Sequence, residues 1–287
     1  MSGFKNFAVV GAGTLGLPII EELLNVKAAG SADKVLLLTR PESVSKYDAL
    51  AARGATIVPI ADYTSTSEVA KALAGIEVVI STLGHSAYGI QIPIAQAAKE
   101  AGAKLFVPSE FGSPTDKATE GLFAAKAGIN RKIRDEVGLP TAVFFTGGFA
   151  DVIWNPLIDL DLKSGSVGVG GDGSAPTSFT SRSDIGRYLA YVLTTLPPSE
   201  TQNKIFRIEG EHASLNDIFA QYEKKHGVKI QVRHTPIEEL EEKVKKNPRD
   251  VASFLGLVWA KGGGAVGSPT DNHLFPDWNP KPVIHYL

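Results

Sequence analysis

The sequence of 287 residues contains no cysteine, which excludes disulfides, thiolate catalysis and metal sites with cysteine ligands. It also has no excess of charge of one sign. Its formal net charge is −2, so the chain has no general attraction to nucleic acids or anionic membranes. No apolar run reaches the length of a membrane span, and the opening residues, Met-Ser-Gly-Phe-Lys-Asn, lack the apolar core of a signal peptide. We therefore expect a cytoplasmic protein that binds neither nucleic acid nor membranes.

Patterns typical of metal binding and of serine hydrolysis are missing as well. The six histidines form no H-E-x-x-H motif and no pair four residues apart. Neither Ser81 nor Ser109 lies in a Gly-x-Ser-x-Gly turn. We expect no bound metal ion, and we expect other residues to carry the chemistry.

What the sequence does contain is a glycine-rich turn near its start. An apolar run at Phe7–Val10 predicts a buried strand, and it leads into Gly11-Ala12-Gly13-Thr14-Leu15-Gly16 and a predicted helix. In this pattern the first glycine makes the tight turn, the second lets a pyrophosphate approach the backbone, and the third packs helix against strand. The N–H groups at the start of the helix would bind the diphosphate. A glycine turn without a ligand is the alternative, but the flanking strand and helix favour a dinucleotide site.

The first half of the chain alternates β-branched strands with helical patterns, which indicates βαβ units. We predict an α/β fold with a Rossmann-type, doubly wound parallel sheet and a ligand crevice at the carboxyl ends of its strands. The predicted strands are Phe7–Val10, Lys34–Thr39, Thr56–Ile60, Glu77–Ser81, Lys104–Val107 and Thr141–Phe145. The predicted helices are Leu15–Asn25, Glu42–Arg53, Ser67–Ala74, Ile90–Ala101 and Gly121–Val137.

After about Trp154 this rhythm changes, and we expect a smaller α/β lobe that binds the substrate. The predicted division is an NADP-binding domain at 1–153 and a lobe at 154–287, with segments near 183–209 returning to the first domain. The elements predicted here are a turn or hairpin at Gly165–Ser174, a helix at Ser183–Leu193 capped by Ser183 or Asp184, a strand at Lys204–Ile208, a helix at Ser214–His226, a solvated charged helix at Pro236–Lys246 and a mobile loop at Ala260–Asn272.

Residues after the second and third predicted strands favour NADP over NAD. NAD-specific sites normally place an acidic residue after the second strand, whereas this chain has Arg40, whose cationic fork suits a 2′-phosphate. A solvent-exposed loop arginine is the alternative. Lys46 is a candidate second phosphate contact. Asp62 is a candidate contact to the adenine amino group, or else an acid at a helix N-terminus.

Residues after the fourth and fifth strands should lie beside the cofactor, because the carboxyl ends of parallel strands share one edge of the sheet. The candidates after the fourth strand are Ser81, Thr82, Leu83 and Gly84. Those after the fifth, where the nicotinamide should lie, are Pro108, Ser109, Glu110 and Phe111. His85 is a candidate to face the nicotinamide ribose, with a loop histidine bonded to backbone as the alternative.

Several motifs together carry a family resemblance that runs from the first strand to about Trp278. They are Val78-Val79-Ile80-Ser81, Pro108-Ser109-Glu110-Phe111-Gly112, Phe123-Ala124-Ala125-Lys126-Ala127-Gly128-Ile129, Gly171-Asp172-Gly173-Ser174 and Asp184-Ile185-Gly186. The chain resembles the atypical short-chain dehydrogenases of the isoflavone, pinoresinol–lariciresinol and phenylcoumaran benzylic ether reductase group, within the NmrA-like family. The resemblance implies an NADPH-binding Rossmann domain, a smaller substrate lobe and a catalytic lysine at Lys126.

The implied role of Lys126 is chemically coherent. A lysine in an apolar pocket loses its charge more readily, so its pKa falls toward the range useful to a general base. Such a base takes or returns a phenolic proton while hydride moves between the nicotinamide and a conjugated carbon. Leu122 stands where other short-chain dehydrogenases carry the tyrosine of Tyr-x-x-x-Lys, which fits a lysine-only branch. A surface helix lysine is the alternative.

The chain also departs from the plant reductases. Its first glycine turn is one residue shorter than their Gly-x-x-Gly-x-x-Gly. Their Asn-x-Phe-Ala reads Gly147-Gly148-Phe149-Ala150 here, and a histidine found in several members has no counterpart before Trp259. These differences spare the cofactor residues and alter the substrate pocket. Phe149, Ile153 and Trp154 are predicted to line that pocket, with ordinary core packing as the alternative.

We therefore expect an NADPH-dependent reductase of an aromatic or phenolic small molecule, and a homodimer as a candidate assembly. One alternative is an NmrA-like sensor that binds the dinucleotide without turnover and regulates a protein partner. Another is an NADPH:quinone reductase of the same fold, which would need little acid–base help. Lys126 favours the enzyme over the sensor, because such regulators tend to lack the catalytic residue.

Overall fold

The computed structural model describes residues 3–287, and its centre is a parallel sheet. Five strands pair in the order β3-β2-β1-β4-β5, and all four pairings are parallel. Their bounds are β1 Asn6–Val10, β2 Lys34–Thr39, β3 Thr56–Pro59, β4 Val78–Ser81 and β5 Leu105–Val107. Strand β6 (Ala142–Phe145) continues the sheet through a bridge between Phe106 and Thr141, and β10 (Lys204–Arg207) pairs with β6. The doubly wound α/β class predicted from the sequence is confirmed.

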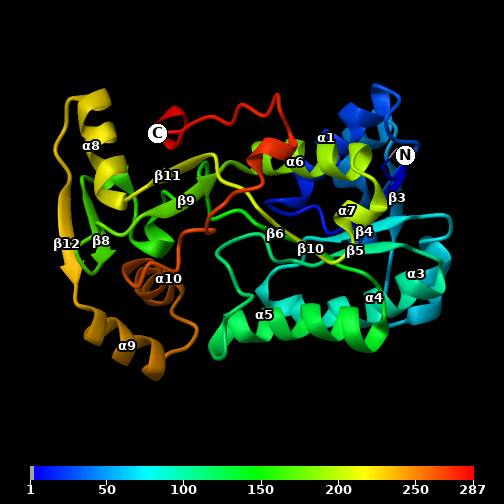
Figure 1. The fold of residues 1–287 in the computed structure, drawn as a ribbon, viewed down its shortest axis with the longest axis horizontal. Coiled ribbons are helices and arrows are strands. Elements are labelled where there is room, and N and C mark those ends of the chain that lie inside the picture. Colours follow the sequence, from blue (N-terminus) through cyan, green and yellow to red (C-terminus); the bar gives the residue numbers. More distant parts are fainter. Residues whose placement is uncertain (1–2) are drawn as a thin grey trace.

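Helices cover both faces of this sheet (Figure 1). One face carries α1 (Gly16–Ala28) and α6 (Arg182–Thr195), which pack against each other. The other carries α3 (Thr66–Ala72), α4 (Gln91–Glu100) and α5 (Gly121–Arg131). The strand residues alternate between the two resulting cores: Phe7 and Val9 join the first core, whereas Ala8 and Val10 join the second. Burial of both faces explains why the strands read as near-continuous apolar runs.

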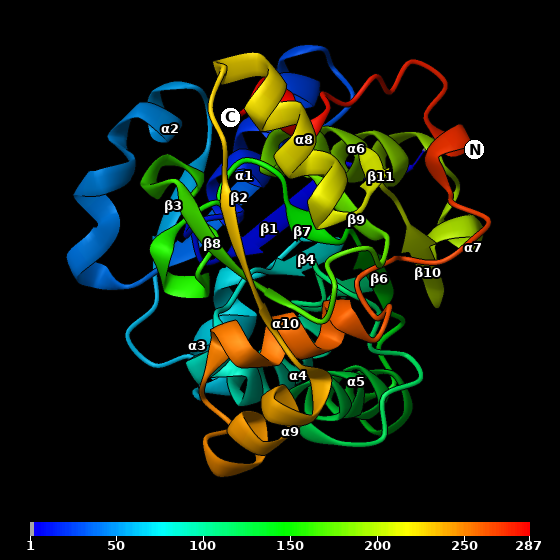
Figure 2. The same ribbon diagram turned by 90° about the vertical axis from the view of Figure 1, so that its left-hand side faces the viewer.

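The second part of the chain builds a lobe beside the sheet, seen at the left of Figure 1 and toward the viewer in Figure 2. One small sheet has the order β11-β9-β7, and β8 pairs with β12 in parallel. The strands are β7 Gly148–Phe149, β8 Ser166–Gly170, β9 Thr177–Thr180, β11 Glu211–Ala213 and β12 Gln231–Thr235. The helices are α8 Leu215–His226, α9 Ile237–Lys246 and α10 Val251–Ala260. The short helices α2 (Asp48–Ala52) and α7 (Pro198–Thr201) complete the chain.

Most predicted elements are confirmed to within three residues, but several differ for identifiable reasons. Helix α6 is capped by Ser181, whose Oγ accepts from Asp184 N, and not by Ser183 or Asp184. The segment Gly165–Ser174 contains the predicted turn, at residues 171–172, but it is not a hairpin, because β8 pairs with β12, some sixty residues away, rather than with β9. The helix predicted at Glu42–Arg53 is a 3₁₀ segment at Pro41–Tyr47 followed by α2. The one predicted at Gly121–Val137 ends as a π-helix at Lys132–Val137.

Other predictions in the lobe are confirmed in detail. Ser214 introduces α8 with a full capping box, since its Oγ accepts from Asp217 N while Asp217 accepts from Ser214 N. The charged helix α9 buries only Leu240 among its residues. Within residues 3–287, no helix is long and apolar enough to cross a membrane.

Candidate active site

A cavity of about 350 Å³ lies at the carboxyl ends of β1, β4 and β5. It is the crevice that a doubly wound sheet offers to a ligand, because loops leave the sheet here in opposite directions. The residues that line it are Gly13, Thr14, Leu15, Thr82, Leu83, Gly84, Tyr88, Ser109, Phe111, Lys126 and Phe149. Ten of these eleven are residues singled out from the sequence, and Tyr88 is the exception.

The glycine turn forms one wall of this cavity. Gly11 has φ +89°, a conformation that side chains rarely adopt, and a Cβ on Gly16 would collide with the carbonyl oxygen of Gly11. At Gly13, by contrast, a Cβ would meet nothing within 4 Å. Within residues 3–287, the backbone N–H groups of Gly13, Thr14 and Leu15 donate to no protein acceptor. Open space beside free N–H groups at the start of α1 fits a diphosphate.

Hydrogen bonds fix the loops around this turn. Thr82 Oγ1 donates to Gly11 O at 2.7 Å, which joins the end of β4 to the turn after β1. Ser109 Oγ donates to Leu83 O at 2.8 Å, and Ser109 N donates to Gln91 Oε1 at 2.8 Å. Arg182 donates to Thr14 O at 3.0 Å from the start of α6. These bonds hold the cavity wall in one geometry, and the roles of Gln91 and Arg182 were not foreseen in the sequence.

Lys126 is the only lysine on the cavity wall, and α5 carries it there. Its side chain is 9% exposed, and its Nζ lies 3.4 Å from Glu110 Oε2 and 5.5 Å from the centre of the Tyr88 ring. Burial lowers the pKa of Lys126, and the nearby carboxylate of Glu110 partly opposes that shift. Lys126 is therefore not the surface lysine that the alternative interpretation described.

Glu110 lies behind this amine and does not line the cavity. It is 2% exposed, and within residues 3–287 neither of its carboxylate oxygens accepts a well-oriented hydrogen bond. Burial raises the pKa of Glu110, and Lys126 opposes the rise. Burial likewise raises the pKa of Tyr88, and the charge of Glu110 adds to it. We find three ionisable groups in contact, all displaced toward their neutral forms.

The other candidate cofactor residues lie around the cavity rather than on its wall. Arg40 is exposed at the end of β2, where its Nε lies 3.2 Å from Glu42 Oε1. It is near Tyr63, whose pKa burial raises to about 12 while the charge of Arg40 opposes the rise. Lys46 is exposed on the 3₁₀ segment that follows.

Asp62, also exposed, is engaged in a local turn. Its Oδ1 accepts from Thr64 N at 2.8 Å and from Thr64 Oγ1 at 2.6 Å. These two hydrogen bonds hold the pKa of Asp62 below its usual range. The carboxylate therefore has a structural task whether or not an adenine binds beside it.

The remaining candidates differ in their surroundings, from buried strand ends to the lobe core and an exposed loop. Ser81 and Pro108 are buried at the strand ends, and Ser81 Oγ has no partner within residues 3–287. Phe149 reaches the cavity, whereas Ile153 and Trp154 pack against the lobe core. Trp154 donates to Ala150 O at 2.8 Å. His85 is exposed and packs edge-on against Tyr88, with the ring centres 6.0 Å apart.

Tyr88 was missed because nothing local marks it. It lies on a 3₁₀ segment at His85–Ile90, six residues beyond Thr82, and only the packing of that segment turns its ring to Lys126. The sole available signal was an aromatic residue in the loop after the fourth strand.

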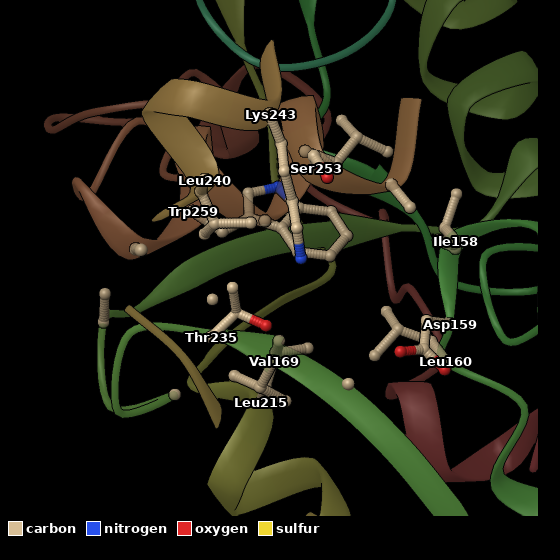
Figure 3. A pocket seen from close by; sticks show the side chains of 18 residues that line it. Ile158, Asp159, Leu160, Val169, Leu215, Thr235, Leu240, Lys243, Ser253 and Trp259 are labelled. Atoms are coloured by element: carbon tan, nitrogen blue, oxygen red, sulfur yellow. The ribbon is translucent and has the colours of Figure 1, made fainter. Parts of the chain in front are cut away.

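A second cavity, of about 110 Å³, lies inside the lobe between β8, β12, α9 and α10 (Figure 3). Figure 3 shows Leu240, Lys243 and Trp259 on one side of it and Val169, Thr235 and Leu215 on the other. It shares no residue with the first cavity. Its lining includes neither the glycine turn between β1 and α1 nor a buried ion pair, so we place the candidate active site in the larger cavity.

The chain is similar to several known proteins in sequence and in fold. The sequence profile of the NmrA-like family matches residues 5–256. A phenylcoumaran benzylic ether reductase of Betula pendula, Betv6, is 30% identical over 313 residues, which cover 99% of this chain and 97% of the relative. Leucoanthocyanidin reductase of Vitis vinifera, solved with NADPH, superposes with a TM-score of 0.82 at 22% identity and 97% coverage of both chains. AtPrR2, solved with NADP+ and (+)-pinoresinol, gives a TM-score of 0.84 at 21% identity and covers 100% of this chain and 98% of its own.

Proposed function

The chain belongs to the NmrA-like family, and from that premise we propose that it is an NADPH-dependent reductase of an aromatic or phenolic small molecule. The observation that carries the proposal is a single cavity in which an open glycine turn faces a buried lysine amine. The relatives add support, since Betv6 is named a phenylcoumaran benzylic ether reductase and the two superposed proteins were solved with NADPH or NADP+.

The residues present fit this cofactor. The free N–H groups of Gly13, Thr14 and Leu15 would hold the diphosphate, and the open space at Gly13 lets it approach. Arg40 would hold the 2′-phosphate, with Lys46 on the segment that follows. When bound, NADPH supplies a hydride. Leu83, Ser109 and Phe111 line the same cavity as Lys126 and would lie beside the nicotinamide ring.

Lys126 acts on a proton of the substrate. Because burial lowers its pKa, a larger share of the amine is neutral near pH 7 than for a solvated lysine. A neutral amine accepts a phenolic proton and returns it once the conjugated carbon has been reduced. Tyr88 and Phe149 both line the cavity and offer aromatic surfaces to such a substrate.

We also propose the division of labour along the chain. Residues 1–153 form the cofactor-binding domain, and 154–287 form mainly the substrate lobe, with 183–209 returning to the first domain. Packing of α6 on α1 and pairing of β10 with β6 support that return. A homodimer remains a prediction that light scattering of the purified protein would check.

NADPH oxidation tests the function. The wild type is assayed with a panel of phenolic, isoflavonoid and quinone acceptors, beside Lys126→Ala and the control Lys132→Ala, which removes an exposed lysine just beyond the same helix. General acid–base catalysis is worth about 10²–10⁴ in rate. We expect Lys126→Ala to lose about that factor on a phenolic acceptor while it still binds NADPH, and Lys132→Ala to match the wild type.

Other outcomes identify the competing functions. Equal turnover of quinones alone by wild type and Lys126→Ala would point to a quinone reductase. NADPH binding without turnover of any acceptor would favour a sensor that binds the dinucleotide and regulates a protein partner. Failure to bind NADPH would refute the proposal.

A further inference from the structure

Lys126 and Glu110 form a buried pair of ionisable groups, and the proposed reductase chemistry assigns a role only to Lys126. Both side chains are buried, at 9% and 2% exposure, and the 3.4 Å contact joins them. Within residues 3–287 neither Glu110 oxygen accepts a well-oriented hydrogen bond, although the nearby Thr115 hydroxyl favours the charged form of Glu110. The Lys126 amine, 3.4 Å away, is the counter-charge of the carboxylate. Buried carboxylates normally collect several hydrogen bonds, and one left open in this way needs a reason.

Few other charges face this pair. From the 3₁₀ segment at His85–Ile90, Tyr88 faces both groups. From the loop after β5, Asp116 adds a second negative charge near Glu110 and is itself paired with Arg207 at 2.5 Å. His85 is exposed and packs edge-on against the ring of Tyr88. The amine and the carboxylate therefore dominate each other's charge.

The ion pair and the neutral pair of amine and carboxylic acid are close in free energy, because opposing effects act on them. As an ion pair, ammonium and carboxylate attract each other but lose the solvation of both charges. As a neutral amine beside a carboxylic acid, they lose the attraction and escape that cost. A single proton shift interconverts the forms: one N–H bond of Lys126 breaks, one O–H bond of Glu110 forms, and no charge leaves the pair.

We propose that Glu110 is the proton partner of Lys126: its carboxylate stabilises the ammonium form of the resting amine and accepts a proton from it when substrate fills the cavity. This inference rests on the proposed function, because it names the residue that controls the general base. Substrate expels water from the cavity wall, and loss of that water favours the form without charges. The amine becomes neutral, accepts the substrate's phenolic proton and later returns it. Glu110 touches neither substrate nor cofactor and is a positioning residue.

Glu110→Gln tests the proposal, since it keeps the size of the side chain and removes the charge. An opposite charge within about 4–6 Å moves a pKa by about 1–3 units. Loss of the carboxylate removes the support of the ammonium form, so the acid limb of the kcat/KM profile should move about 1–3 pH units toward acid. The control Asp116→Asn removes the other nearby acid and should leave that limb within a few tenths of a unit.

A second measurement does not depend on turnover. The small reagent acetic anhydride acylates only neutral amines, and mass spectrometry follows its reaction with Lys126 as pH is varied, without cofactor or substrate. The inflection should lie lower in Glu110→Gln than in wild type by the same 1–3 units. Agreement of the two shifts supports the proposal. If no acceptor on the panel is turned over, the acylation shift still decides the role of Glu110, so failure of the proposed function is recognised separately.

Some results would overturn it. An inflection that stays in place in Glu110→Gln, or a loss of activity by one factor at every pH, would make Glu110 a structural residue only. Folding is checked with Lys126→Met/Glu110→Gln, which leaves no buried charge without a partner. If this double variant melts at or above the temperature of Glu110→Gln, the fold tolerates the amide and the pH data stand. If Glu110→Gln is unfolded, acylation of Glu110→Asp, which moves the charge away from the amine, should show a smaller shift of the same sign, and no shift would again refute the proposal.

Discussion

The two cavities of this protein differ in how their polar groups are satisfied. Around the second cavity, beside α10 and hereafter the α10 cavity, Ser253 Oγ donates a hydrogen bond to Asp250 at 2.8 Å. There, too, Lys243 forms an ion pair with Glu239 at 2.8 Å, and Asp159 forms one with Arg233 at 2.6 Å. Around the larger cavity, Ser81 Oγ and both Glu110 oxygens lack well-oriented hydrogen bonds within the described part of the chain, and backbone N–H groups of the glycine turn have no protein acceptor there.

This difference teaches where chemistry can reside. A group already bonded to the protein has little to offer a ligand, whereas an open donor or an unpaired buried oxygen is costly until something meets it. We therefore interpret the second cavity, the one beside α10, as a part of the lobe's packing, and the larger cavity as the functional site. Variants at the two cavities should therefore separate loss of stability from loss of binding.

Trp259→Ala should affect stability and not the site. The indole is 6% exposed beside the α10 cavity, and removal of a buried tryptophan side chain costs about 3–5 kcal/mol of unfolding free energy. Urea denaturation measures this loss, and isothermal calorimetry at low temperature should give an NADPH Kd within about threefold of wild type. Leu157→Ala, at a side chain that is 86% exposed, is the control and should cost well under 1 kcal/mol. A loss of NADPH affinity by the folded tryptophan variant would mean that the two cavities are coupled.

Arg40→Glu should affect binding and not stability. A hydrogen bond to a charged group is worth about 1.5–3 kcal/mol, so we expect NADPH affinity to fall roughly 10- to 150-fold while NADH affinity changes little. Fluorescence titration with both nucleotides measures the ratio. Arg249→Glu reverses an exposed charge in the lobe and should leave both affinities unchanged. Equal losses for NADPH and NADH would refute a phosphate contact at Arg40.

Alanine at two neighbouring glycines should separate packing from ligand access. At Gly16 the new methyl group would collide with the carbonyl of Gly11, and overpacking of this kind costs about 1–3 kcal/mol of stability. At Gly13 it meets no protein atom, so stability should hold while NADPH affinity falls about tenfold. Thermal melts with and without NADPH distinguish the two variants. Full NADPH affinity in Gly13→Ala would show that the diphosphate does not approach this turn.

Asp250→Ala should have the smallest effect. Asp250 caps α10 by accepting from Ser253 N at 3.0 Å, and loss of such a cap costs about 1 kcal/mol. The hydrogen bonds from Ser253 N and Ser253 Oγ lower the pKa of Asp250. Its contribution is therefore present above the unfolded pKa near 3.8 and is lost as pH falls through the lower folded value. The difference in denaturation midpoint from wild type should shrink below about pH 4, with Arg249→Ala as the neighbouring control. A difference that persists at low pH would assign the effect to packing.

Local pattern predicted much of the fold. Strands such as Lys34–Thr39 and helices such as Leu215–His226 follow from apolar runs and caps within a few residues of each other. Most residues that line the larger cavity could also be predicted from the sequence, because strand ends in a parallel sheet converge on one edge whatever the details of packing. The pairing of β8 with β12 could not be predicted from the sequence, because two short strands so far apart along the chain carry no local pattern that identifies their partner strand.

By itself, the sequence determined the alternation of strands and helices, the glycine turn and the placing of Lys126 on a helix after the fifth strand. The position of Glu110, off the cavity wall and 3.4 Å from that amine, depends on tertiary packing, as does the placing of the Tyr88 ring 5.5 Å from the same amine. The physical reason is range. Periodicity and capping act over one or two turns of chain, whereas the charge state of a buried amine depends on which distant groups share its dry environment.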